Sequence, residues 1–177
     1  MLTYDIYSSD YYSLASKFQV DPDSCANPDH YNTYLTQNAY IDHQKGLATT
    51  YVFLDDEKEK TIIGYISIKA TALIDEMEDA IVGYPALEVA ELAVSKDYSR
   101  KGYGKKIMKF AINLAVELSE KIGIRYVLVC ADPMAVEFYK CKGLEFRVLA
   151  DYTGQLIPRE SWNTTCVPMA KQLMELP

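Results

Sequence analysis

The sequence predicts a single mixed α/β domain over residues 1–177, and two observations support that prediction. A β-rich segment at Ala86–Val94 leads into a Gly-x-Gly turn, and an amphipathic helix follows at once. Farther on, Ile124–Cys130 is a near-continuous apolar run, as expected for a strand that is buried on both faces. With 49% apolar residues, a chain of 177 residues can bury a sizeable core. No repeat, low-complexity tract or linker divides it.

The elements before Ala86 are predicted from periodicity and turn residues. They are a strand, two helices and the two strands of a hairpin, at Leu2–Tyr7, Ser9–Lys17, Pro28–His43, Leu47–Leu54 and Ile62–Ala70. The acidic stretch Ile74–Val82 is expected to be a solvated loop that leads into the Ala86 strand. Beyond Phe146, the segment Thr164–Met169 is expected to be a strand that closes the sheet.

The segment from Ala86 to the helix indicates a ligand that carries phosphates. Ala86–Val94 alternates apolar and polar residues, as a half-buried strand does. Gly102 and Gly104 allow the backbone to approach a bound group, and the helix after them presents free N–H groups and the positive end of its dipole. The apolar face of that helix is formed by Ile107, Phe110, Ala111, Leu114, Ala115 and Leu118.

Two common phosphate-binding motifs are absent from the sequence. The turn lacks the third glycine of the dinucleotide fingerprint GxGxxG, and the chain contains no nucleoside triphosphate loop. The run from Ser99 to Gly104 instead resembles the pyrophosphate-binding signature of the GNAT superfamily of acetyl-CoA-dependent acetyltransferases. That signature has Gln or Arg, two variable residues, Gly, one variable residue, and Gly or Ala. Ser99 departs from it, which affects one side-chain contact but not the backbone contacts.

A second segment, Asp132–Phe146, resembles the other GNAT signature, N-x-x-A-x-x-F-Y-x-x-x-G-F. Asp132 stands at the Asn position, and Phe146 lies two residues beyond the usual Phe. The local chemistry also predicts a helix, because Asp132 is a suitable cap, Pro133 suits a first helical turn and Gly143 suits the residue after a helix end.

The resemblance implies a single GNAT-like domain of the α+β type. Its central mixed, mostly antiparallel sheet would be flanked by helices and splayed at the Ala86–Val94 strand. It also implies acetyl-CoA as co-substrate. The expected coenzyme contacts are the backbone along the strand, the Gly-x-Gly turn, and two residues of the second signature: Leu92, Ala93, Val94, Ser99, Arg100, Lys101, Gly102, Tyr103, Gly104, Lys105, Asp132 and Phe138.

Three residues are candidates for catalysis. By resemblance, Tyr139 matches the tyrosine that GNAT enzymes place near the acetyl-CoA sulfur, where its hydroxyl can protonate the departing thiolate. An attacking amine must also lose a proton, because an alkyl ammonium has a pKa near ~10. Glu88 stands six residues before Val94, where the histone-acetylating branch carries its base, and Glu91 is the rival on the other strand face. The alternative is a purely structural role, in which either glutamate makes a hydrogen bond within the fold and Tyr139 packs in the core.

The net charge of −7 is unevenly distributed. Between Lys96 and Lys109, six basic residues and one acid give +5, which leaves −12 for the rest of the chain. The basic side chains either form a solvated helix face or meet the phosphates of coenzyme A. The acidic remainder argues against a broad nucleic-acid surface.

Other chemistries find little support in the sequence. His30 and His43 lack helical metal-ligand spacing and are expected on a solvated helix or loop, so no metal site is predicted. Cys130 is expected to be a reduced thiol inside a strand. With no signal peptide and no apolar run long enough to span a bilayer, we expect a cytoplasmic protein without a membrane partner. The sequence leaves room for a homodimer.

The acceptor is predicted only by class, as a small amine or a peptide or protein amine. The acids Asp75, Glu76, Glu78 and Asp79 could attract a cationic amine. A second hypothesis is a toxin that acetylates aminoacyl-tRNA, because Asn27–Ala70 resembles GNAT toxins. Those toxins tend to be basic and usually have Arg where this chain has Glu91. A third is a non-catalytic acyl-CoA-binding module.

Overall fold

The computed structural model describes residues 2–55, 60–77, 79–149, 156–157 and 166–173. The chain packs as two compact units. Unit 1 comprises Met1–Lys69 and Ala90–Phe110, and unit 2 comprises Ala70–Val89 and Ala111–Pro177. The boundaries fall inside three long elements, which are β3 (Thr61–Met77), β4 (Ala80–Val94) and α4 (Tyr103–Ile122).

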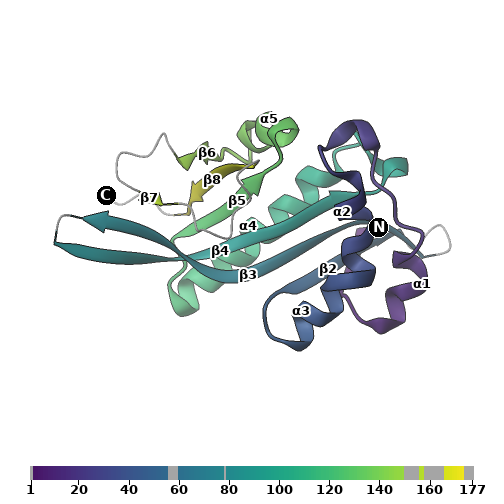
Figure 1. Cartoon of the computed structure of the whole chain (residues 1–177), viewed down its shortest axis with the longest axis horizontal. Helices are drawn as coiled ribbons and strands as arrows, with labels where there is room; N and C mark the ends of the chain where they lie inside the picture. Colours follow the sequence, from purple (N-terminus) through teal and green to yellow (C-terminus); the bar gives the residue numbers. More distant parts are fainter. Residues whose placement is uncertain (1, 56–59, 78, 150–155, 158–165, 174–177) are drawn as a thin grey trace. The chain divides into compact units, whose positions relative to one another are not determined.

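The strands form one sheet with the order β1-β2-β3-β4-β5-β8-β6, and β7 pairs with β3 (Figure 1). The remaining strands are β1 (Leu2–Ile6), β2 (Thr49–Asp55), β5 (Tyr126–Ala131), β6 (Arg147–Val148), β7 (Leu156–Ile157) and β8 (Val167–Gln172). The pair β4–β5 is parallel, whereas the pairs β1–β2, β2–β3, β3–β7, β5–β8 and β6–β8 are antiparallel. The mixed, mostly antiparallel sheet of the prediction is therefore confirmed.

The pairing of β4 with β5 covers only part of both strands. It runs from Ala86 opposite Tyr126 to Val89 opposite Val129. Beyond that point β5 continues through Ala131 with pairing to β8, and β4 continues to Val94. Within the described residues no register joins the two strands after Val89, so the predicted splay at this strand is confirmed.

The predicted half-buried character of the Ala86 strand is wrong for its first four residues. Ala86, Leu87, Glu88 and Val89 are all buried. β4 lies in the middle of the sheet, and because consecutive strand residues point to opposite faces, the burial of all four shows that both faces of this segment are covered. Alternation in a sequence predicts a half-buried strand only when one face meets solvent.

The acidic stretch Ile74–Val82 is not the loop that its charge suggested. Its first residues extend β3 to Met77, and β4 begins at Ala80 after a turn residue, Asp79. Glu78 lies outside the described residues. The β-branched residues Ile81 and Val82 favour an extended backbone, which outweighs the preference of the neighbouring acids for a loop.

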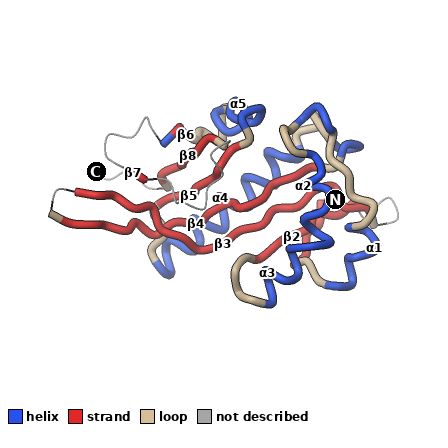
Figure 2. Tube along the Cα trace, in the orientation of Figure 1, coloured by secondary structure: helices blue, strands red, loops and turns tan. Residues whose placement is uncertain are grey.

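Unit 1 contains the N-terminal helices, which Figure 2 shows in blue beside β2 and β3. They are η1 (Ser9–Tyr11), α1 (Tyr12–Ala15), η2 (Pro22–Ser24), α2 (Pro28–Tyr34), the π-helical η3 (Leu35–Ala39) and α3 (Tyr40–Gln44). The side chain of Asn27 caps α2 by accepting the N–H of His30 at 3.3 Å. These helices share a buried core with the sheet, and its members include Phe18, Tyr34, Leu35 and Tyr65.

Unit 2 has its own core and a covalent cross-link. Leu73, Tyr126 and Leu128 belong to a buried cluster with Leu149 and the smaller Ala86 and Ala170. Cys130 forms a disulfide with Cys166, so the prediction of a reduced Cys130 is wrong.

The pairing of β5 with β8 explains the cross-link. It places Cys130 opposite Pro168, and the Cα atoms of the two cysteines lie 5.4 Å apart. A pairing between residues so distant in the sequence cannot be deduced from cysteine spacing. The first two residues of the predicted strand Thr164–Met169 lie outside the described residues. Cys166 precedes β8, and Val167–Met169 belong to it.

Candidate functional site

The turn after β4 has the backbone geometry of an anion-binding loop. A short 3-10 helix, η4 (Lys96–Tyr98), follows β4, and α4 begins at Tyr103. Between them Arg100 has a φ of 57° and Gly102 a φ of 82°. Left-handed residues in a turn bring successive N–H groups to one side, and a helix start adds further N–H groups and a positive dipole end. We call Ser99–Lys105 the cradle.

Gly102 has open space above its backbone and lies in a turn with a left-handed conformation. A Cβ added there would meet nothing within 4 Å, so the room above the backbone is open. Arg100 is not a glycine, yet it also adopts a left-handed conformation. Such strain persists where the surrounding structure enforces it, and it is concentrated at ligand-binding turns.

Several contacts within unit 1 fix the approach to the cradle. The N–H of Ser95 donates to the carbonyl of Ile63 at 2.8 Å, and that of Lys96 to the carbonyl of Gln19 at 2.8 Å. The Tyr98 hydroxyl donates to Asp55 Oδ2 at 2.7 Å. This hydrogen bond, helped by burial, raises the pKa of Tyr98 to about 12. The phenol therefore stays protonated and keeps its bond across the physiological range.

Arg100 and Lys101 of the cradle are exposed, whereas Lys105 is half-buried. Lys101 Nζ donates to the carbonyl of Asp97 at 2.6 Å and lies 5.8 Å from the ring centre of Tyr98. Just after the cradle, Lys106 Nζ lies 5.1 Å from the ring centre of Tyr103. A guanidinium nitrogen of Arg100 lies 4.0 Å from Asp21 Oδ2, and most of the Arg100 side chain is exposed to solvent. Such an exposed ion pair costs little free energy to break.

The strand that leads to the cradle carries the predicted backbone contacts for a coenzyme arm. Leu92 and Val94 are partly exposed, whereas Ala93 is buried. Gly64 of β3 makes close packing possible here. A Cβ on Gly64 would lie 2.6 Å from the carbonyl oxygen of Ala93 and 2.7 Å from Ile107 Cδ1.

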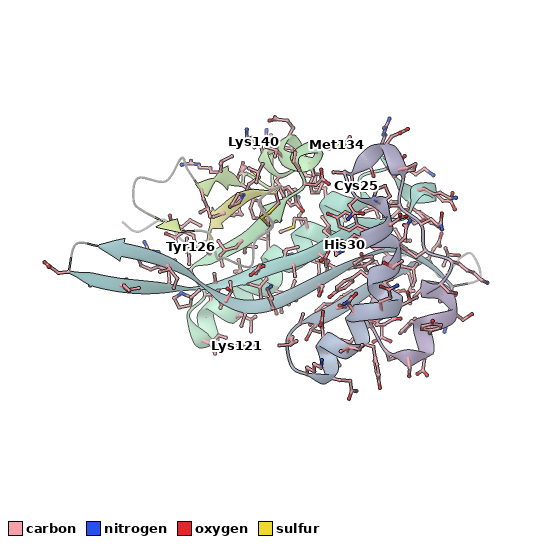
Figure 3. All side chains as sticks on the ribbon, in the orientation of Figure 1. Cys25, His30, Lys121, Tyr126, Met134 and Lys140 are labelled. Carbon is pink, nitrogen blue, oxygen red and sulfur yellow. A yellow bond between two sulfur atoms is a disulfide. The ribbon has the colours of Figure 1, made fainter. Side chains whose placement is uncertain are left out.

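Glu91 is paired with His30, a contact that the sequence reading missed. His30 Nε2 lies 2.9 Å from Glu91 Oε1, and the side chains are 46% and 16% exposed. The hydrogen bond to Glu91 raises the pKa of His30, and burial opposes it in part. The rings of Tyr31 and Tyr34 lie 5.2 and 6.3 Å from that of His30. His30 does lie on a helix, labelled in Figure 3 at α2, but it is not simply solvated.

Glu88, the other candidate base, occupies a different environment in unit 2. Its residue is 4% exposed, and it sits opposite Leu128 in the parallel pairing of β4 with β5. Glu88 and Glu91 are three residues apart on one strand, so their side chains point to opposite faces of the sheet.

Tyr139 lies in a small aromatic cluster of unit 2. Asp132 accepts the N–H of Met134 at 2.9 Å and so caps η5 (Pro133–Ala135), which leads into α5 (Val136–Lys140). Tyr139 is 5% exposed, and its ring centre lies 4.9 Å from that of Phe138 and 5.6 Å from that of Phe146. The predicted helix start is confirmed.

The turn after α5 differs from the prediction, because the helix ends at Lys140 and Gly143 is not the residue directly after it. Gly143 lies within the turn with a φ of 90°, and the N–H of Phe146 donates to the carbonyl of Tyr139 at 3.0 Å. The two residues inserted before Phe146 therefore do not remove it from the Tyr139 cluster.

The part of the chain that the structure describes contains no group of three His, Cys, Asp or Glu side chains able to hold a metal ion. Its helices include none with the length and apolar character needed to cross a bilayer.

Residues 4–144 match the acetyltransferase (GNAT) family. The chain belongs to this family. Both segments that resemble GNAT signatures begin within the match, and the second ends two residues beyond it. A search of curated proteins found no match.

Solved structures similar to the chain include GNAT toxins. A tyrosine-to-phenylalanine mutant of the AtaT toxin, bound to the C-terminus of the antitoxin AtaR and acetyl-CoA, has a TM-score of 0.72 at 20% identity, over 97% of this chain and 93% of that one. AtaT complexed with acetyl-methionyl-tRNAfMet has a TM-score of 0.71 at 18% identity, over 95% and 94%. A comparable mutant of KacT has a TM-score of 0.73 at 15% identity, over 97% and 95%. At these identities the likeness shows the fold.

Proposed function

We propose that this chain transfers the acetyl group of acetyl-CoA to a primary amine, by direct attack of the amine on the thioester. The observation that carries the proposal is the cradle. Two left-handed residues, Arg100 and Gly102, open a turn at the start of a 20-residue helix, in a segment of net charge +5. An anion with several phosphates fits that combination of backbone donors, dipole and cations.

The cradle and the strand before it supply most of the proposed coenzyme contacts. Backbone N–H groups of Ser99–Lys105 would bind the pyrophosphate, with the side chains of Arg100 and Lys101 close to it. The amide-rich pantetheine arm would pair with the backbone of Leu92–Val94 like an added strand. The splay beyond Val89 leaves that stretch of β4 without a β5 register, which supports this placement. Asp132 and Phe138 are proposed as further contacts.

The proposed chemistry needs a proton acceptor and a proton donor. The acceptor amine must lose a proton before it attacks, and the departing sulfur must gain one. Tyr139 is the proposed donor. Glu88 and Glu91 remain the candidate carboxylates for the first step. Because Glu88 is almost fully buried, it would act through a water molecule, whereas Glu91 is partly exposed.

A second candidate function is acetylation of the α-amine of an aminoacyl-tRNA. The similarity to AtaT complexed with acetyl-methionyl-tRNAfMet favours it. The charge of −12 outside Lys96–Lys109 opposes it, because tRNA binding depends on neutralising phosphates. An amine on a small molecule or a peptide therefore fits the chain better.

A labelled-acetyl assay tests the proposal. The purified chain is incubated with radiolabelled acetyl-CoA and with polyamines, amino acids, peptides or aminoacyl-tRNA, and the product is identified by mass spectrometry. We expect transfer to a small or peptide amine and no growth arrest on expression. Acetylated aminoacyl-tRNA, with growth arrest that a Tyr139 substitution relieves, would establish the second function. Coenzyme binding without transfer to any acceptor would indicate a non-catalytic acyl-CoA-binding module.

A further inference from the structure

We propose that His30, held by Glu91, is the group that takes the proton from the acceptor amine. The inference rests on the proposed function, and it assigns the proton to a residue that has no counterpart in the sequence motifs. The observation behind it is the 2.9 Å contact between His30 Nε2 and Glu91 Oε1, which joins α2 to β4 inside unit 1.

The contact fixes the tautomer of the imidazole. An ionised carboxylate can only accept a hydrogen bond, so Nε2 carries the hydrogen and donates it to Glu91. The other nitrogen, Nδ1, is then the basic one. For Nδ1 no partner is recorded among the residues that the structure describes, and the His30 side chain is about half exposed. A carboxylate behind an imidazole orients the ring and makes it a better proton acceptor.

The position of Glu91 on the strand places the pair at the reacting end of the coenzyme. In the proposed complex the phosphates lie at the cradle, beyond Val94, and the arm runs back along Val94, Ala93 and Leu92. Three strand residues span ~10 Å. Glu91 comes directly before Leu92, so the end of the arm that carries the thioester falls beside Glu91.

Among the described residues, the groups that face His30 come from β4 and α2. From β4, Glu91 faces it, and from α2, the rings of Tyr31 and Tyr34 do. Tyr65 of β3 lies behind them, and its hydroxyl donates to the carbonyl of Tyr31 at 2.9 Å. Burial raises the pKa values of Tyr34 and Tyr65, and the negative charge of Glu91 raises them further. These tyrosines therefore stay neutral while His30 titrates.

The proton balance of the step is complete. Nδ1 of neutral His30 takes one proton from the ammonium, and the freed nitrogen forms a bond to the thioester carbon. The carbon–sulfur bond then breaks, the sulfur keeps the electron pair, and Tyr139 gives it a proton. Tyr139 regains a proton from the new amide nitrogen, and His30 releases its proton to solvent.

The test combines histidine titration with pH–rate profiles. The chain has only two histidines, so His43→Gln assigns their NMR signals and serves as the matched helix control. We expect His30 to titrate above its ordinary pKa near ~6.5 and to fall in pKa in Glu91→Gln. With an amine acceptor, His30→Gln should lose about 10²- to 10⁴-fold in kcat at neutral pH and regain rate as pH approaches the pKa of the amine.

Glu91→Gln provides the readout that a merely structural pair would not give. Because the pKa of His30 falls in this variant, the acid limb of kcat/KM should move to lower pH, with a loss of about 10- to 100-fold at the plateau. Full activity of His30→Gln, or an unmoved acid limb in Glu91→Gln, would overturn the inference and leave the proposed function standing. Absence of acetyl transfer by the unaltered chain would defeat the proposed function itself, whatever the histidine titration shows.

Discussion

Unit 1 presents the cradle and His30 on exposed or half-exposed residues, whereas unit 2 holds Glu88 and Tyr139 in a packed interior. Unit 2 is also cross-linked by a disulfide, whereas Cys25 of unit 1 is not disulfide-bonded. The difference teaches that substitutions in the cradle or at His30 should change ligand binding or turnover at little cost in stability. Substitutions that shorten the buried side chains of Glu88 or Tyr139 should affect both rate and packing.

Among the substitutions in unit 2, the largest effect is expected from Tyr139→Phe. Only a hydroxyl is removed, so the aromatic cluster should persist and coenzyme affinity should change little. Loss of a proton donor should lower kcat by ~10- to 1,000-fold at every pH. Steady-state kinetics and calorimetric binding separate the two effects. Tyr126→Phe, equally buried in unit 2, is the control that should retain activity. Full turnover by Tyr139→Phe would exclude the donor role.

Removal of the disulfide should destabilise unit 2. The disulfide joins Cys130 and Cys166, which are 36 residues apart in the sequence. Such disulfides typically contribute about 2–4 kcal/mol to the free energy of unfolding. Replacing both cysteines by serine should lower stability by that amount in denaturant unfolding. The same replacement of Cys25 and Cys141, which are not disulfide-bonded, should not lower stability by that amount. Four titratable thiols in the unreduced, denatured protein would contradict the cross-link.

Two glycines test the packing of each unit by the same substitution. In unit 1, Gly64→Ala forces a Cβ against the Ala93 carbonyl at 2.6 Å and should cost about 1–3 kcal/mol of folding free energy. In unit 2, Gly83→Ala meets nothing nearer than 3.6 Å. It should be neutral or slightly stabilising, because alanine restricts the unfolded chain. Equal melting temperatures for the two variants would show that the close approach in unit 1 is wrong.

The smallest effect concerns the stability that the His30–Glu91 pair provides. The folded-state pKa of His30 is raised, so this stability is fully present below the unfolded value of about 6.5 and is lost as pH rises through the folded value. Unfolding free energies of the unaltered chain and Glu91→Gln should therefore differ more at about pH 6 than at about pH 9. The exposure of His30 limits the difference to less than about 1 kcal/mol.

Local signals in the sequence predicted much of the fold. Gly102 marked the turn before α4, Asp132 and Pro133 marked the start of the last helices, and the apolar run at Ile124–Cys130 marked β5. In each case neighbouring residues settle the backbone conformation. The prediction of a loop at Ile74–Val82 was wrong because the β propensity of Ile81 and Val82 outweighs the preference of the neighbouring acidic residues for a loop.

Long-range pairings could not be predicted. His30 and Glu91 are 61 residues apart, and only the packing of α2 against the sheet brings them together. The same holds for Cys130 with Cys166. Local periodicity placed His30 on a helix but gave no sign of the partner that the fold supplies.

The central claim is that the cradle binds coenzyme A, and calorimetric titration tests it most directly. Gly102 and Gly46 both have a positive φ, 82° and 66°, and an added Cβ meets nothing within 4 Å at either. Valine at either position therefore costs similar backbone strain, but only Gly102→Val would place a side chain where the phosphates bind. We predict that acetyl-CoA binds the unaltered chain and Gly46→Val with equal affinity and that Gly102→Val loses most of it. Normal binding by a folded Gly102→Val variant would contradict the account.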